Sequence, residues 1–215
     1  MDPSLLNSVN AVLSTVFDPR LGPPPGKDLV SAKMVESVEV KDGALCVGIA
    51  LPNAAMGEAS VWQDRIGRAL AGLAPQGKVK VSIAVKVKAR AIPATMKRLT
   101  GIKNIIAVAS GKGGVGKSTT AANLALALAA EGARVGMMDA DIYGPSQTMM
   151  LGAAGQAYSN DQNKIEPKVA YGVQVISMGM LTNEDTPMVW RGPMASSAME
   201  QLLTETAWED VDYLV

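Results

Sequence analysis

Residues 111–119 read Gly111-Lys112-Gly113-Gly114-Val115-Gly116-Lys117-Ser118-Thr119. They match G-x-x-x-x-G-K-[ST], the pattern of a loop that wraps around the phosphates of a nucleotide. The glycines let the backbone turn tightly, so that successive N–H groups converge on phosphate oxygens. We expect all nine residues to form the phosphate site, with Lys117 reaching the β- and γ-phosphates and the Ser118 hydroxyl binding Mg²⁺.

The residues on either side of this loop fit the same interpretation. The apolar run 105–109 is typical of a buried parallel strand, and the Ala- and Leu-rich segment 118–131 predicts a helix that Gly132 ends. Strand, glycine loop and helix in this order place a phosphate at the positive end of the helix. The alternative is a glycine-rich turn that binds nothing. We therefore predict an α/β fold, with the N-terminal part of a P-loop NTPase parallel sheet flanked by helices.

Two carboxylates follow the next predicted strand. Residues 133–138 are largely apolar, and Asp139 and Asp141 come at and just after the end of this run. Because the carboxyl ends of parallel strands border the ligand crevice of an open α/β sheet, both are candidates for the magnesium site. Alternatively, they cap the turn at Gly144 and the helix that follows it.

The C-terminal part predicts two more strands, 173–178 and 211–215, and a helix over 193–206. Only four strand candidates then follow residue 103, which is few for such a sheet. Strand 211–215 ends before the acidic Walker B residue that a P-loop ATPase needs. We expect a C-terminally truncated ATPase domain, and hydrolysis by this chain alone stays open.

Residues 1–90 predict a separate small α+β domain, joined by a linker over residues 91–103 to the ATPase domain over residues 104–215. Its predicted elements are a helix beginning at Pro3 with Asp2 as its cap, a hairpin of 34–40 and 44–50, a helix carrying Trp62, and a strand over 78–90 in which valines alternate with lysines.

The composition argues against several classes of partner. Lys+Arg and Asp+Glu are both 20, so no overall charge favours nucleic acid or a membrane, and we expect neither. The lysine face of residues 78–90 is a local exception, either a solvated strand face or a surface for an acidic partner or nucleic acid. Cys46, the single cysteine, is expected to pack beneath the helices of the first domain. One cysteine and no visible signal peptide are compatible with the cytoplasm.

Lys112 is the loop residue that indicates which family of P-loop proteins this chain resembles. The form of residues 111–119 resembles the deviant Walker A loop of the MinD/ParA-like P-loop superfamily. The order of the two domains points to one branch of it, the Mrp/ApbC-type iron–sulfur cluster carrier ATPases with an N-terminal iron–sulfur-assembly domain. The segments that carry this resemblance are Asp18-Pro19, Asp28-Leu29-Val30, residues 138–146 and Val189-Trp190-Arg191-Gly192-Pro193-Met194.

The resemblance implies a cytoplasmic homodimer that binds a [4Fe–4S] cluster, transfers it to apo-proteins, works with assembly factors, and binds and hydrolyses ATP. It implies three catalytic residues. Lys112 would reach the phosphates of the facing subunit, beside Lys117, and Asp141 would orient the attacking water and contact Mg²⁺ through water. Asp139 would support the magnesium shell.

This chain departs from the family in its cysteines. The family holds its bridging cluster with a C-x-x-C pair, and the ligand cysteines are absent from this chain, where thiolates are the ligands that such clusters require. Residues 51–56, where many relatives of the first domain have a cysteine, also lack one. Two other functions stay open, a MinD/ParA-like positioning ATPase on membrane or DNA, and a module that binds partners through residues 1–90.

Overall fold

The computed structural model describes residues 3–142, 144–181 and 192–215. Asp2, predicted to cap the first helix, lies outside the described residues, and so do Tyr143 and residues 189–191, which belong to two of the segments that resemble the family. The chain divides into two compact units, Met1–Val87 and Lys88–Val215, and each is described by itself.

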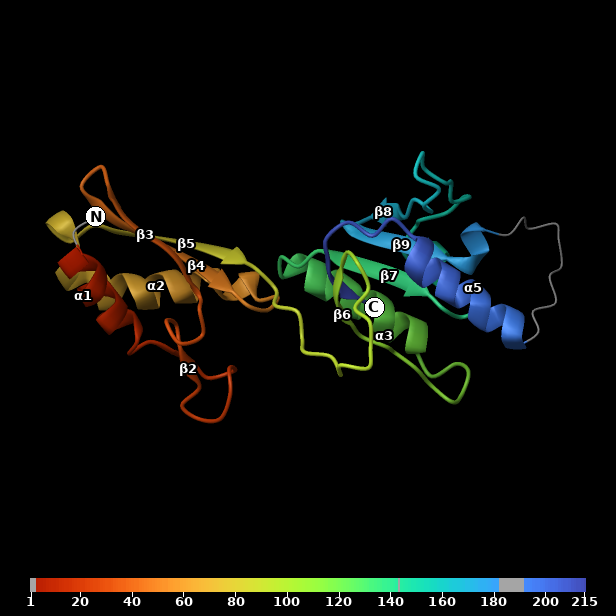
Figure 1. The fold of residues 1–215 in the computed structure, drawn as a ribbon, viewed down its shortest axis with the longest axis horizontal. Helices are drawn as coiled ribbons and strands as arrows, with labels where there is room; N and C mark the ends of the chain where they lie inside the picture. The colour runs from red at the N-terminus through yellow and green to blue at the C-terminus, as the bar shows by residue number, and fades with distance from the viewer. Residues whose placement is uncertain (1–2, 143, 182–191) are drawn as a thin grey trace. The chain divides into compact units, whose positions relative to one another are not determined.

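The first unit is a three-stranded sheet with helices packed on it (Figure 1). The central strand pairs antiparallel with one neighbour and parallel with the other, in the order β3-β4-β5. The predicted hairpin, the helix from Pro3, the helix carrying Trp62 and the alternating strand are confirmed, the last ending at Val85. The elements are α1 (Pro3–Leu13), β1 (Phe17–Asp18), β2 (Lys27–Asp28), β3 (Val35–Lys41), β4 (Ala44–Leu51), η1 (Met56–Glu58), α2 (Ala59–Leu70), η2 (Ala71–Leu73), η3 (Pro75–Gly77) and β5 (Val79–Val85).

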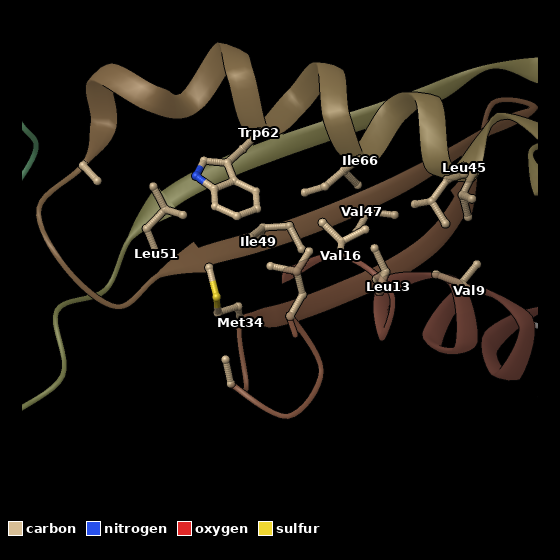
Figure 2. Close-up of a cluster of buried hydrophobic side chains, with 14 residues drawn as sticks. Val9, Leu13, Val16, Met34, Leu45, Val47, Ile49, Leu51, Trp62 and Ile66 are labelled. Carbon is tan, nitrogen blue, oxygen red and sulfur yellow. The ribbon is translucent and has the colours of Figure 1, made fainter. Parts of the chain in front are cut away.

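One face of β4 forms the core of this unit. Successive strand residues point to opposite faces of a sheet, and every second residue of β4 is buried in a single apolar cluster with α1 and α2. Figure 2 shows Trp62 and Ile66 of α2 directed at these strand side chains. The cluster members from β4 are Leu45, Val47, Ile49 and Leu51.

Cys46 lies on the other face of β4. It alternates with the core residues Leu45 and Val47, and the strand register places Glu39 and Lys80 beside it on the two flanking strands. The expectation that Cys46 packs beneath the helices is therefore wrong, because its two neighbours occupy that face. Its thiol is partly exposed.

The second unit is a five-stranded sheet in the order β6-β10-β7-β9-β8, parallel except for the edge strand β8. The sequence interpretation counted four strands and missed β8, which is only three residues long and joins β9 through Tyr171 and Gly172, both at positive φ. The elements are β6 (Ile102–Ile105), α3 (Lys117–Ala130), β7 (Val135–Asp139), α4 (Gln147–Met150), β8 (Lys168–Ala170), β9 (Val173–Ser177), η4 (Met178–Met180), α5 (Gly192–Glu205) and β10 (Val211–Leu214).

Strand β6 lies earlier in the chain than the apolar run predicted. β10 pairs with residues 102–105, and only one more ladder bond, from Ile106 N–H to the Leu214 carbonyl at 2.8 Å, extends toward the loop. A strand before the loop is confirmed, but its predicted limits of 105–109 are wrong because pairing with β10 covers residues 102–105 and ends near Ile106. The residues of the apolar run line a cavity. Residues 88–98 bond to the outer side of β6: the Asn104 side chain donates to the Lys88 carbonyl, and Arg98 donates to that of Lys103.

The helix after the loop is confirmed as α3, and the helix over 193–206 as α5. Gly132 follows the last turn of α3 with a φ of +85° and donates its N–H to the Ala129 carbonyl, as a C-terminal capping glycine does. Among the described residues, no helix combines the length and the hydropathy needed to cross a membrane.

Candidate functional site

The glycine loop lies between β6 and α3. Gly116 directly precedes the first residue of α3, and Gly114 and Gly116 have φ values of +73° and +87°. Side chains are strained at these angles, which explains the glycines. A Cβ at either position would meet no atom within 4 Å, so the backbone there is open to an approaching ligand. The loop therefore fits the phosphates of a nucleotide, whose charge the N-terminus of a 14-residue helix would stabilise.

A cavity of about 600 Å³ opens at the C-terminal ends of β6, β7 and β10. This size is within the range of small-molecule sites. Of the predicted site residues, the structure brings Lys117, Ser118, Asp139 and Asp141 together in its lining. The polar residues of the lining are Ser110, Lys117, Ser118, Asp139, Asp141 and Gln147.

Lys117 and Asp141 form an ion pair within this cavity, with Nζ 2.8 Å from Oδ2. Both side chains are about one-third exposed, at 30% and 37%. The other carboxylate oxygen of Asp141 accepts the Gly144 N–H at 3.2 Å. Asp141 thus connects the first turn of α3 to the segment that follows β7.

Asp139 is buried at the end of β7, and its carboxylate accepts three backbone N–H groups. Oδ1 accepts from Asp141 at 3.1 Å, and Oδ2 accepts from Ser146 and Gln147 at 2.8 and 2.9 Å. This arrangement matches the capping role that the sequence left as an alternative. Its effect is to fix the turn on which Asp141 lies.

Gln147 is a site residue that sequence reasoning missed. It is 3% exposed, lines the cavity, and donates its Nε2 to the Ser118 carbonyl at 2.9 Å. The available signal was its place directly after the segment 139–146, at the start of the helix that the aspartates were expected to cap. A polar side chain at such a buried position usually has a hydrogen-bonding role.

Lys112 and the outer part of the loop lie apart from this lining. Lys112 is exposed, and its N–H donates to the Ser110 hydroxyl, which in turn donates to the Lys112 carbonyl. In the described part of the chain, neither Lys112 nor Thr119 is among the residues that line the cavity. Their predicted roles stay predictions.

Asp212 is an acidic residue on β10 that lies away from the cavity. It is 3% exposed and bonds to Lys103 Nζ at 2.6 Å and to the Arg134 N–H at 2.9 Å. Burial alone would raise its pKa, but the hydrogen bonds from Lys103 and Arg134 outweigh it and hold the pKa of Asp212 below its ordinary value. Asp212 therefore joins β10 to β6 and to the residue that directly precedes β7, and it is not among the residues that line the cavity.

The fold and the site together define a P-loop nucleotide-binding protein. A family model described as NUBPL iron-transfer P-loop NTPase matches residues 101–215, just over half of the chain. The chain belongs to this family. A second model, described as an iron–sulfur cluster assembly protein, matches residues 7–83. The resemblance drawn from the sequence is confirmed for both parts of the chain.

Curated relatives with the name iron–sulfur cluster carrier protein extend this result. The protein from Haemophilus influenzae is 44% identical over 216 residues, which cover 97% of this chain and 56% of its own length. The protein from Pseudomonas fragi is 56% identical over 149 residues, covering 68% and 52%. The chain thus spans about half the length of these relatives. A solved nucleotide-binding protein in complex with ADP, from Archaeoglobus fulgidus, is 36% identical with a TM-score of 0.46, over 54% of this chain and 44% of that one.

Proposed function

We propose that this chain is part of an iron–sulfur cluster carrier that binds clusters, transfers them to apo-proteins, and binds and hydrolyses ATP. The nucleotide-binding part of this proposal is supported by one observation: Lys117, Ser118 and Asp141 line the same cavity, beside an open glycine loop. The cluster half is supported by the names of the relatives and by the assembly-type model over residues 7–83.

In this proposal each polar residue of the cavity has a distinct role. The loop N–H groups and Lys117 would bind the phosphates, and the Ser118 hydroxyl and Asp141 would hold Mg²⁺, Asp141 through water. When bound, magnesium supplies positive charge that stabilises the phosphates during transfer. Asp141 also orients the attacking water. Asp139 supports the magnesium shell through Asp141, since its own oxygens already accept backbone N–H groups.

The proposed working unit is a cytoplasmic homodimer. Lys112 is exposed, as a residue that reaches a facing subunit must be. Two copies of a chain with one cysteine offer too few thiolates for a [4Fe–4S] cluster, so we assign the cluster ligands to cysteines outside residues 1–215. Residues 1–90 would be the assembly-type domain, 91–103 the linker and 104–215 the ATPase part.

The test is anaerobic reconstitution of the protein at the full length of its relatives. Iron and sulfide are counted per dimer, and transfer of the cluster to an apo-protein is followed with and without MgATP. A labile cluster that passes to the acceptor supports the proposal. A protein that takes up no cluster but binds lipid vesicles or DNA when ATP is present would refute it in favour of a positioning ATPase.

A further inference from the structure

Gln147 makes two of the contacts that hold the nucleotide cavity together. Its backbone N–H donates to Asp139 Oδ2 at 2.9 Å, and its side-chain Nε2 donates to the Ser118 carbonyl at 2.9 Å. Ser118 is in the first turn of α3, and Asp139 ends β7. One buried residue therefore joins the helix that begins at the glycine loop to the turn that carries Asp141.

The remaining polar atom of Gln147 has no hydrogen-bond partner among the residues that the structure describes. Oε1 is fully buried, and the neighbouring Ser146 Oγ is likewise buried without a hydrogen-bond partner among the described residues. A buried amide oxygen without a donor costs free energy, so folded proteins rarely leave one in place. The cost is explained if a donor arrives with a ligand, and Gln147 lines the cavity into which the ligand would enter.

The neighbours of Gln147 limit which donor that is. Its own amide group is bonded to Ser118, the residue whose hydroxyl is proposed to bind Mg²⁺. An O–H group bound to a cation is polarised and becomes a stronger hydrogen-bond donor, while an amide oxygen is a neutral acceptor that tolerates the cation nearby. Nucleotide phosphates offer acceptors and would repel Oε1.

We propose that Gln147 is a positioning residue for the magnesium–nucleotide complex, in which Oε1 accepts a hydrogen bond from an O–H group bound to magnesium. This inference rests on the proposed nucleotide function and adds a residue to it. Loading of the cavity would then tighten the link between α3 and the turn 139–147, which carries Asp141.

The test compares ADP binding with Mg²⁺ and with EDTA, by calorimetry, in the full chain and two variants. Gln147→Met keeps the shape and removes both polar groups, whereas Gln147→Glu restores an acceptor. We expect Gln147→Met to lose about tenfold or more of the enhancement of ADP binding by Mg²⁺, the size of one charge-assisted hydrogen bond. Gln147→Glu should retain the enhancement.

A matched control is Gln174→Met. Gln174 lies in β9, and both ends of its amide are bonded to the Glu209 backbone, away from the cavity. It should leave the enhancement by Mg²⁺ unchanged. Equal enhancement in wild type and Gln147→Met, or equal loss in the Met and Glu variants, overturns the inference while the nucleotide function stands. Wild-type protein that binds no ADP under either condition overturns both.

Discussion

Lys117 Nζ lies 2.8 Å from Asp141 Oδ2, so the cation of the glycine loop is paired with a carboxylate that the chain itself provides. An incoming phosphate must compete with Asp141 for this cation. The pair is partly exposed, and partly exposed pairs contribute about 1 kcal/mol or less. In the proposed function, a multiply charged phosphate would win this competition and would free Asp141 to take part in binding magnesium.

Removing the lysine should weaken nucleotide binding strongly. We expect Lys117→Ala to bind ATP about 10- to 100-fold more weakly, because hydrogen bonds to charged groups contribute about 1.5–3 kcal/mol. Calorimetric titration measures the change. Lys168→Ala, in β8 and outside the cavity lining, is the control and should bind as wild type does. Equal affinity in both variants would contradict the assignment of Lys117.

Removing the Asp141 carboxylate should change ADP binding only when metal is absent. In EDTA, Asp141→Asn frees Lys117, and we expect ADP to bind about two- to fivefold more tightly. With Mg²⁺ this gain should disappear, and ATP turnover should fall because the water is no longer oriented. Fluorescence titration under the two conditions separates these effects. Weaker binding in EDTA would show that the ion pair does not compete with phosphate.

Lys112 offers a test of the dimer. Because its side chain is outside the lining of the cavity, Lys112→Ala should change ADP affinity by less than about twofold, the scale of a solvated surface charge. If the lysine acts on the facing subunit, the variant should lose the ATP-dependent dimer and the turnover together. Light scattering with and without ATP measures the dimer, and the release of phosphate measures the turnover. A variant that dimerises and hydrolyses normally would leave Lys112 as a solvated loop residue.

The lowered pKa of Asp212 predicts that the sheet of the second unit loses stability at low pH. This pKa is lower in the folded protein than the ordinary 3.8, so the unfolded chain binds the proton first, and folded stability falls as the pH drops through and below that value. Asp212→Asn should cost about 1–3 kcal/mol at neutral pH and remove part of this pH dependence. Urea unfolding between neutral pH and pH 3, followed by circular dichroism, tests it. Parallel pH profiles in variant and wild type would contradict the prediction.

The sequence predicted the elements that repeat a strong pattern and missed those that depend on pairing partners. The glycine loop, α3 and the position of Asp139 and Asp141 after β7 follow from motif and periodicity. The limits of β6 do not, because they depend on pairing with β10, more than a hundred residues away in the chain. β8 is too short to show periodicity.

Four polar residues of the cavity lining, Lys117, Ser118, Asp139 and Asp141, were predictable from the sequence, whereas Gln147 and the internal bonds of the site were not. Lys117 and Ser118 follow from the loop motif, but no local pattern shows that Asp139 accepts three N–H groups or that Gln147 bonds to Ser118. The face of Cys46 was misjudged because the alternation of β4 is the same whichever side the helices cover; the larger apolar residues next to Cys46 take the covered side.

The placement of the tryptophans gives each unit its own optical reporter. Trp62 is 4% exposed in the core of the first unit, and Trp208 is 8% exposed in the second, where its ring lies against the space that Gly136 leaves free of a side chain. A buried indole changes its emission when its unit opens. In a chain whose third tryptophan, Trp190, is also replaced by phenylalanine, Trp62→Phe and Trp208→Phe variants would therefore report the unfolding of the second and of the first unit separately.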